Sequence, residues 1–311
     1  MLFFRKVVST FRQRALAAWE WLYGRAYVLL ALTTLMWGGN AVASRLAVGH
    51  ISPMALTCLR WLGVCFLLAP LMHRAVAAEA AALRPRWRYV VVMAALGFTL
   101  FNALMYAAAH HTSAVNLTIL QGSVPVLVLL GALLWLGTPI RLVQIVGGAV
   151  TMIGVVAVAA RGDIATVARL AFNIGDVWMI VACAGYAAYT VALRRRPAVP
   201  GLVFFSAMAG VAFLLSLPLL AAEIATGDVV WPDAQGLVIL AYVTLFPSLL
   251  SQLFFMRGVE LIGPGRAGLF VNLVPVFGAI LAVGLLGEPF RYYHALGLAL
   301  VLGGIWLAER Q

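Results

Sequence analysis

Neutral polar and aromatic side chains interrupt stretches of the chain that are otherwise solidly apolar. Amides, hydroxyls and aromatic rings form hydrogen bonds and cover apolar surface, so the chemistry that they offer is reversible binding. Trp37 and Asn40 are three residues apart and would share a helix face, as would Tyr186 and Tyr189. The polar residues are Asn40, Asn102, Gln121, Ser123, Ser248, Ser251, Gln252 and Asn272, and the aromatic residues near them are Trp37, Tyr106, Tyr186 and Tyr189.

Sequence patterns that would indicate catalysis or a bound metal are missing. There is no HExxH pattern, no serine–histidine motif and no pair of aspartates within the apolar stretches. The three cysteines all fall inside apolar stretches, which indicates neither a disulfide framework nor a zinc site. Residues 263–268 fit the dinucleotide pattern GxGxxG, but no strand precedes them, so we interpret them as a small-residue helix start. We therefore predict no catalytic residues, no metal and no cofactor.

His110 and His111 are the one pair of adjacent histidines. Neighbouring residues point to different faces of a helix, and this pair lies at the end of an apolar stretch. A solvated loop pair is therefore favoured over a metal or proton site.

The elements that position the polar residues follow from composition. Hydrophobic residues make up 64% of the 311 residues and charged residues only 10%, against roughly 45–50% and 25% in soluble domains. A helix needs about 20 apolar residues to cross the hydrocarbon core of a membrane. We predict an all-α integral membrane protein with ten transmembrane helices, near residues 27–48, 53–72, 89–109, 113–136, 142–160, 175–193, 200–222, 235–256, 266–287 and 291–308.

The basic residues are distributed unevenly between the loops on the two sides. If the N-terminus is cytoplasmic, most arginines fall on the cytoplasmic side, including those of the basic loops 73–88 and 194–196. The other side holds only Arg45, Arg161, Arg169 and Arg291, together with an acidic loop at 223–233. Both termini are therefore predicted to be cytoplasmic. The net charge of +11 is explained by anionic lipid at that face, without nucleic acid as a partner.

Residues 1–26 precede the first predicted span. Apolar residues recur there at helical spacing between basic residues, which predicts an amphipathic helix at the membrane surface. A cleaved signal peptide is the alternative, but the unbroken apolar run of 7–15 residues that it requires does not occur before Tyr27.

An internal repeat appears when the chain is shifted by 150 residues. Eleven identities fall within the 31 positions that align 124–154 with 274–304, without a gap. They include Pro125 with Pro275, Pro139 with Pro289 and Arg141 with Arg291, and Gln144 matches His294 in kind. We predict two five-helix repeats, 27–160 and 175–308, within one integrated domain. Because five is odd, the second repeat must be inverted, as in many secondary transporters.

Several motifs resemble the drug/metabolite transporter superfamily, specifically the ten-helix EamA-type permeases. They are Trp37-Gly38-Gly39-Asn40 followed by Arg45, Ser52-Pro53 followed by Arg60, Pro125, and Gly287-Glu288-Pro289. The resemblance covers roughly residues 27–308. One departure is Gly137-Thr138-Pro139, since the family usually has Gly-Glu in the first repeat as well as in the second.

The resemblance implies a central cavity lined by the first, third, fourth, sixth, eighth and ninth helices. Each polar or aromatic residue named above falls on one of these helices, where interhelical packing is the alternative role. Pro125 and Pro275 remove a backbone hydrogen bond and are predicted to break their helices beside the site, with a purely structural kink as the alternative. The predicted substrate-binding residues are Trp37, Asn40, Asn102, Tyr106, Gln121, Tyr186, Tyr189, Ser248, Gln252 and Asn272.

Three other features carry expectations. Arg60 lies outside the helices that the resemblance assigns to the cavity, so we expect a structural anchor rather than a substrate contact. Glu260 and Glu288 lie near membrane ends, where interfacial charge is favoured over a role in proton coupling. Ala295, Ala299 and Gly303 form a small-xxx-small ridge that predicts close helix packing.

Together these features predict a secondary transporter that moves a small neutral or zwitterionic metabolite, an amino acid or amphipathic compound, by alternating access. The resemblance implies efflux. Protons are the candidate coupling ion, and the expected partners are the substrate and membrane lipid, with the protein a monomer or homodimer. The predicted location is the bacterial inner membrane. The alternatives are an intramembrane enzyme and a membrane scaffold that transports nothing.

Overall fold

The computed structural model describes residues 20–137, 139–163, 173–262, 267 and 270–309, and within them the regular structure is helical, with no strand. Eight helices are long and apolar enough to cross a membrane, and they match eight of the predicted spans. Shorter apolar helices, Val274–Leu286 and Tyr292–Ala308, occupy the ninth and tenth predicted spans. The protein is therefore a multi-pass membrane protein, while the count of ten crossings stays a prediction.

Several spans consist of two or more helical segments joined end to end. The continuous spans are α2 (Ala26–Leu46), α3 (Pro53–Ala78), α9 (Leu142–Ala159), α11 (Ile174–Ala192, extended by η4, Leu193–Arg195), α12 (Gly201–Thr226) and α17 (Tyr292–Glu309). The composite spans are α4 (Ala80–Leu83), η1 (Arg84–Arg86), α5 (Trp87–Ala94), η2 (Ala95–Leu100) and α6 (Phe101–Ala108); α7 (Ala114–Leu120), η3 (Gln121–Ser123) and α8 (Val124–Leu136); and α13 (Ala234–Val243), η5 (Thr244–Leu250) and α14 (Ser251–Ile262). α16 is Val274–Leu286.

Local sequence explains where several helices begin and end. Ser113, Asn173 and Asp233 each accept a backbone N–H at the start of α7, α11 and α13, as capping residues do. Gly137 and Gly287 end α8 and α16 in the left-handed conformation, with φ of 65° and 64°, which glycine adopts without strain. The two repeats thus share the positions at which these helices end as well as the apolar stretches.

The repeat also preserves the start of its last helix. The backbone N–H of Arg141 donates to Gln144 Oε1 at 2.9 Å, and the N–H of Arg291 donates to His294 Nδ1 at 3.1 Å. A glutamine and a histidine therefore satisfy the same otherwise unpaired donor at the start of α9 and of α17. This shared role explains why the two residues match in kind.

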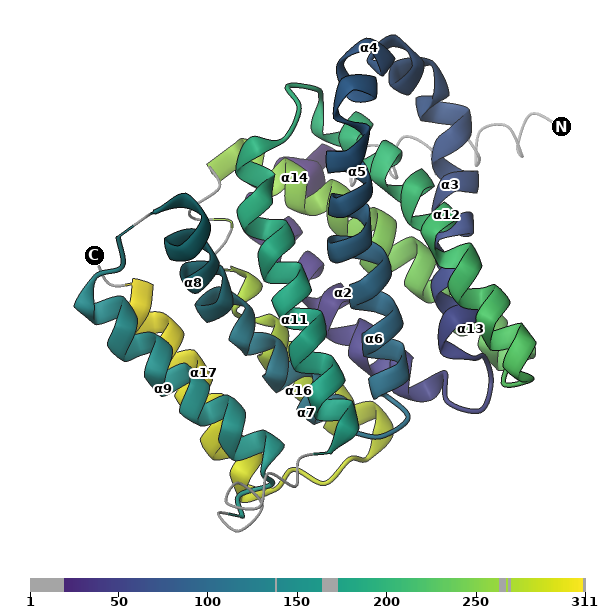
Figure 1. The fold of residues 1–311 in the computed structure, drawn as a ribbon. Helices are drawn as coiled ribbons and strands as arrows, with labels where there is room; N and C mark the ends of the chain where they lie inside the picture. The colour runs from purple at the N-terminus through teal and green to yellow at the C-terminus, as the bar shows by residue number, and fades with distance from the viewer. Residues whose placement is uncertain (1–19, 138, 164–172, 263–266, 268–269, 310–311) are drawn as a thin grey trace, which may run out of the picture.

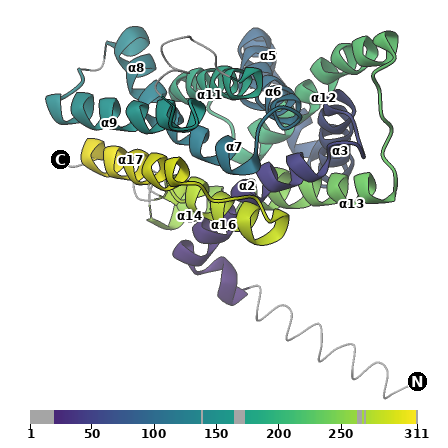
Figure 2. The same ribbon diagram turned by 90° about the horizontal axis from the view of Figure 1, so that it is seen from below.

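The helices form a bundle with one pair at each end (Figures 1 and 2). α9 and α17 lie side by side at one end, and α3 and α12 lie together at the other. Between them, α2 packs against α14 and α16, and α11 packs against α6 and α8. The first helix of each repeat therefore contacts the third and fourth helices of the other repeat, as a pseudo-twofold axis requires.

Glycines allow α9 and α17 to meet at backbone distance. A Cβ on Gly147 would lie 2.5 Å from the carbonyl oxygen of Gly304, and one on Gly154 would lie 2.8 Å from that of Gly297. Gly297 is the repeat equivalent of Gly147, and Gly304 is the repeat equivalent of Gly154. The two contacts, Gly147 with Gly304 and Gly154 with Gly297, are therefore equivalent to each other under the repeat. The helices are antiparallel, which is the arrangement that inverted repeats produce.

The predicted ridge of Ala295, Ala299 and Gly303 is wrong as a packing surface. All three residues are exposed, and a Cβ on Gly303 would have nothing within 4 Å. The packing face runs through Gly297 and Gly304, whose spacing of seven residues is two helical turns. Residues spaced by four, such as Ala295, Ala299 and Gly303, and residues spaced by seven, such as Gly297 and Gly304, each lie on one face of a helix. The sequence alone therefore does not show which of the two faces packs against α9.

Equivalent irregularities lie in the middle of both repeats. The third predicted span of each is π-helical where the copies align, in η2 and in η5. The fourth span of the first repeat is interrupted by the 3-10 turn η3, immediately before Val124-Pro125. The corresponding span of the second repeat is interrupted by a turn at Asn272 and Leu273, immediately before Val274-Pro275.

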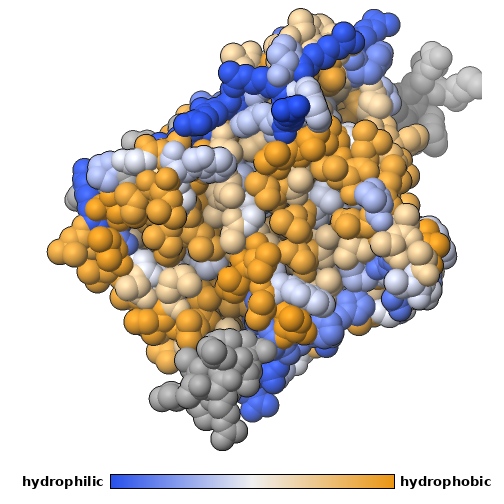
Figure 3. Space-filling model, in the orientation of Figure 1, coloured by the Kyte–Doolittle hydropathy of each residue, from blue (hydrophilic) through white to orange (hydrophobic). Residues whose placement is uncertain are grey.

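The surface has the pattern expected of a protein in a bilayer. In Figure 3 hydrophobic residues cover most of the middle of the face shown, and hydrophilic residues gather along the upper edge beside α4. Large apolar side chains on this protein are exposed, for example Phe66, Leu134 and Val238, and only lipid would cover them without cost. Residues 1–19, which hold most of the predicted amphipathic helix, lie outside the described residues.

Orientation is open to direct measurement. We expect a cysteine at Asp228, in the loop that follows α12, to react with a membrane-impermeant thiol reagent in intact cells. A cysteine at Glu79, beside the basic loop before α5, should react only after the membrane is opened. Both positions sit beside loops whose charges differ in sign. The variants are made in a protein lacking Cys58, Cys65 and Cys183, and the reverse labelling pattern would overturn the predicted orientation.

Candidate functional site

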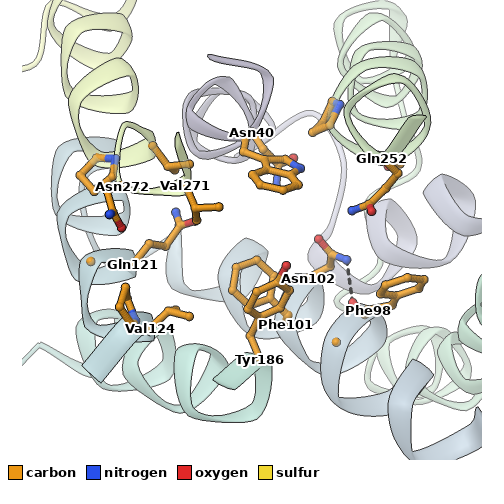
Figure 4. A pocket seen from close by; sticks show the side chains of 18 of the residues that line it. Asn40, Phe98, Phe101, Asn102, Gln121, Val124, Tyr186, Gln252, Val271 and Asn272 are labelled. Atoms are coloured by element: carbon orange, nitrogen blue, oxygen red, sulfur yellow. Dashed lines mark hydrogen bonds between the residues drawn. The ribbon is translucent and has the colours of Figure 1, made fainter. Parts of the chain in front are cut away.

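A central cavity of about 910 Å³, counting the space at its mouth, lies between the two repeats. In Figure 4, Gln121 and Asn272 lie together on one side, and Asn40, Asn102 and Gln252 lie on another. The wall is formed by Trp37, Asn40, Arg60, Trp61, Gly97, Phe98, Phe101, Asn102, Gln121, Gly122, Val124, Pro125, Tyr186, Pro247, Ser248, Gln252, Val271, Asn272, Val274, Pro275 and Ile305.

Most of the residues that the sequence nominated for binding line this cavity. They are Trp37, Asn40, Asn102, Gln121, Tyr186, Ser248, Gln252 and Asn272, with Pro125 and Pro275 at the two helix interruptions. The cavity wall does not include Tyr106 or Tyr189. Tyr106 is buried beside Asn40, to whose Oδ1 its hydroxyl donates, and Tyr189 packs between Phe98 and Tyr186. Substrate binding by any of these side chains stays a prediction.

Arg60 lies on the cavity wall, contrary to its predicted place away from the cavity. Its side chain extends from α3 and is only 4% exposed. Nε donates to Ser248 Oγ at 2.6 Å, and Nη1 donates to Asn102 Oδ1 at 2.8 Å, to Asn40 Oδ1 at 3.2 Å and to the Tyr106 hydroxyl. The predicted anchoring role is compatible with these bonds, but the guanidinium is also part of the cavity wall.

Two polar side chains around the cavity are oriented by hydrogen bonds to main-chain carbonyls of the third and eighth spans. Asn102 Nδ2 donates to the carbonyl of Phe98 at 2.6 Å, and the Ser248 hydroxyl donates to the carbonyl of Val243. Both bonds involve the π-helical segments or their edges, and such segments are frequent at functional sites. Trp37 Nε1 donates to Ser251 Oγ at 3.0 Å, which joins the first span to the eighth.

Aromatic rings form the rest of the wall. Trp61 stacks on Phe98 with ring centroids 4.6 Å apart and an interplanar angle of 6°, and Phe101 contacts Tyr186 at 5.2 Å. Such surfaces supply large apolar contact area with fixed geometry. The described part of the wall therefore offers neutral amides, aromatic faces and the buried guanidinium of Arg60.

Sequence reasoning missed part of this wall. Trp61, Phe98, Phe101, Val271 and Ile305 look like ordinary apolar residues within their spans, and no periodicity marks the side of the helix that faces a cavity. Arg60 carried a usable signal, since a charge inside a span is costly unless it meets protein or water. The family resemblance, however, does not count the second helix, which contains Arg60, among the helices that line the cavity.

No group of three or more His, Cys, Asp or Glu side chains that could hold a metal occurs in the described part of the chain. His110 and His111 are both exposed, and the ring of His111 contacts Trp178. The carboxylate of Glu260 pairs with Arg257 at 3.0 Å.

Two carboxylates form hydrogen bonds from one repeat to the other at the predicted outer face. Glu288, which follows α16, accepts the backbone N–H groups of Ala114 and Val115 at the start of α7, at 2.9 and 3.0 Å. Glu223, near the end of α12, accepts the hydroxyl of Ser52 at 2.6 Å and the N–H of Ala55 at 3.1 Å at the start of α3. Each carboxylate lies at the positive end of a helix of the other repeat.

A further cross-repeat cluster lies near the same face and was not anticipated. Asp176 of α11 is 1% exposed, and its Oδ1 accepts the hydroxyl of Thr112 at 2.6 Å and Asn116 Nδ2 at 3.4 Å. His294 Nε2 lies 3.1 Å from Asn116 Oδ1. Because His294 Nδ1 accepts the Arg291 N–H, the proton on Nε2 points to Asn116.

Comparisons with known proteins give a consistent result. The sequence model of the EamA-like transporter family matches residues 24–160 and 173–309. The uncharacterized transporter YyaM of Bacillus subtilis is 25% identical over 286 residues, covering 91% of this chain and 93% of that protein. An uncharacterized transporter of Archaeoglobus fulgidus is 25% identical over 289 residues, covering 91% and 96%. One solved crystal structure, described only as that of a protein, matches with a TM-score of 0.64 at 20% identity over 91% of this chain and 96% of the solved chain, which concerns the fold alone.

Proposed function

The chain belongs to the EamA-like transporter family, and from this premise we propose that it is a secondary transporter which carries a small organic solute through the central cavity by alternating access. Efflux is the direction that the family resemblance implies. The proposal includes ten crossings, both termini in the cytoplasm and a bacterial inner-membrane location. It also includes function as a monomer or homodimer, with protons as the candidate coupling ion.

The observation that carries this proposal is the position of the cavity between two copies of one structural unit. Equivalent residues of the two repeats meet on its wall, namely Asn102 with Gln252 and Pro125 with Pro275. A site on a pseudo-twofold axis can be exposed to either side when the repeats exchange conformations, which is the geometric basis of alternating access.

The alternatives require features that the cavity wall does not offer. An intramembrane enzyme needs a nucleophile with a general base, or a metal, and the part of the cavity wall that the structure describes has no histidine, cysteine or carboxylate. A scaffold has no use for a polar cavity in the bilayer, where polar groups are costly. The substrate class predicted from the sequence, a neutral or zwitterionic metabolite, is based on a wall rich in amides and aromatic rings but poor in fixed charge, and Arg60 adds a buried positive charge to that wall.

Replacing Gln252 by alanine tests the role of the cavity. Gln252 lies on its wall in α14, so we expect transport to fall about tenfold or more while folded yield stays unchanged, which corresponds to about 1.4 kcal/mol of lost binding free energy. Asn102→Ala should reduce transport further, because Asn102 also holds Arg60. The measurement is counterflow into proteoliposomes, with a panel of labelled amino acids, aromatic carboxylates and aromatic amines.

Gln235→Ala is the matched control, since Gln235 is exposed at the start of α13. If folded Asn102→Ala and Gln252→Ala transport every solute of the parent at unchanged rate and affinity, the polar residues only pack helices. If the parent protein moves no solute of the panel, the result opposes the proposal of transport itself.

A further inference from the structure

We propose that Arg60 is the anion-binding group of the central cavity and that the transported solute is held there by a carboxylate group. This inference rests on the proposed transport function and specifies its substrate class. It departs from the neutral or zwitterionic class predicted from sequence, because it makes the carboxylate the recognised group.

The first step is the environment of the guanidinium. Arg60 is almost fully buried, and its four hydrogen-bond partners, Ser248, Asn102, Asn40 and Tyr106, are all neutral. Among the described residues the ion pairs are His50 with Asp233 and Arg257 with Glu260; both are partly exposed, and neither includes Arg60. Neutral dipoles orient the cation but leave its charge uncompensated.

The second step is the orientation of those partners. Asn102 Nδ2 donates to the carbonyl of Phe98, and the Ser248 hydroxyl donates to the carbonyl of Val243. The Tyr106 hydroxyl donates to Asn40 Oδ1. Each partner therefore turns an oxygen lone pair toward Arg60. The arrangement holds a charged guanidinium in one place on the cavity wall, as a preorganised binding group requires.

The third step is the sign of the remaining wall. Among the residues that the structure describes on the cavity wall, there is no carboxylate and no formal charge besides that of Arg60. The wall thus favours an anion and disfavours an organic cation.

The fourth step narrows the anion. Arginine pairs well with carboxylate, while phosphorylated solutes are generally held by several cationic groups, and Arg60 is the one cationic group among the described residues of this wall. Trp61 packs beside the guanidinium, 5.5 Å from its central carbon to the ring centroid, and Phe98 stacks on Trp61. A carboxylate attached to an apolar, ring-sized body fits this combination. A simple monocarboxylate and an amino acid share that chemistry.

Four probes with the same aromatic body separate the possibilities. They are phenylacetate, which is an anion, phenylalanine, a zwitterion, phenylacetamide, which is neutral, and phenethylamine, a cation. Binding to the purified full-length protein is measured by the fluorescence of tryptophan, since Trp37 and Trp61 line the cavity. We expect phenylacetate to bind at least tenfold more tightly than phenylacetamide, with phenethylamine weakest. Binding of phenylalanine beside phenylacetate would identify the amino-acid source, and its exclusion would identify simple carboxylates.

Variants at Arg60 connect the preference to this side chain. Arg60→Gln should abolish the difference between phenylacetate and phenylacetamide, and Arg60→Lys, which keeps the charge but not the planar fork, should retain part of it. Arg45→Gln is the matched control, because Arg45 donates to the Ala109 carbonyl and does not line the cavity. If Arg60→Gln does not fold, the four probes on the parent protein and on Arg60→Lys still decide the question.

Two results would overturn the inference while leaving transport intact. One is equal affinity for the anionic and neutral probes. The other is counterflow of neutral or cationic solutes while no carboxylate-bearing solute is transported. Absence of binding and of counterflow for every solute would instead contradict both the inference and the proposed function.

Discussion

Gly304→Val is expected to lower the stability of the protein more than any other substitution considered. A Cβ at this position would lie 2.5 Å from the carbonyl oxygen of Gly147 and 2.6 Å from the backbone nitrogen of Thr151. Backbone atoms cannot rotate away as a side chain can, so α17 must move away from α9. Overpacking of this kind costs about 1–3 kcal/mol and occasionally more. We expect little folded protein, with an apparent unfolding temperature several degrees lower in detergent.

The neighbouring glycine supplies the control. Gly303→Val adds the same atoms to the same helix, but its Cβ has open space around it, so the expected change in unfolding temperature is near zero. Fluorescence-detected size exclusion after heating measures both variants. Equal stability of Gly304→Val and Gly303→Val would show that the antiparallel glycine contact between α9 and α17 is not formed in the protein.

Glu288→Ala is expected to loosen the contact between the repeats at the predicted outer face. The substitution removes the acceptor of two backbone N–H groups at the start of α7, and hydrogen bonds to a charged group contribute about 1.5–3 kcal/mol each when shielded from water. Glu288 is half-buried, so we expect the lower part of that range. The measurement is hydrogen exchange at Ala114 and Val115, which should become faster.

Glu260→Ala serves as its control, since Glu260 makes only an exposed ion pair with Arg257, and such pairs contribute about 0–1 kcal/mol. Hydrogen exchange at α7 should not respond to it. Unchanged exchange at Ala114 and Val115 in Glu288→Ala would mean that the carboxylate does not hold the start of α7.

The amino-acid sequence was sufficient for the spans and for the internal repeat. Apolar length fixes a span physically, and proline, glycine and arginine matches such as Pro125 with Pro275 are too specific to arise from composition. Sequence also nominated most of the polar residues on the cavity wall, because a polar side chain inside a bilayer needs a reason to be there. Substrate binding by these residues stays a prediction, which the Asn102→Ala and Gln252→Ala variants test.

Other features depend on tertiary contacts that one sequence does not encode locally. The π-helical segments η2 and η5 lie at the same place in the two repeats but share no sequence signature, since Pro247 in η5 corresponds to Gly97 in η2. The position of Arg60 on the cavity wall depends on how far α3 reaches between its neighbours. The packed face of α17 was misassigned because small residues occur on two faces of that helix, and only contact with α9 distinguishes them.

The cross-repeat carboxylate at Glu288 also bears on the equilibrium between the two conformations of the protein. If the repeats were identical, exchanging their conformations would give two states of equal free energy, each populated by half of the molecules. The position equivalent to Glu288 in the first repeat is Thr138, which has no carboxylate. The contact that Glu288 makes with the start of α7 therefore has no carboxylate equivalent at the matching position of the first repeat. Because each 1.4 kcal/mol changes a population ratio about tenfold, this one inequality would shift two otherwise equal states toward the state in which Glu288 holds the start of α7.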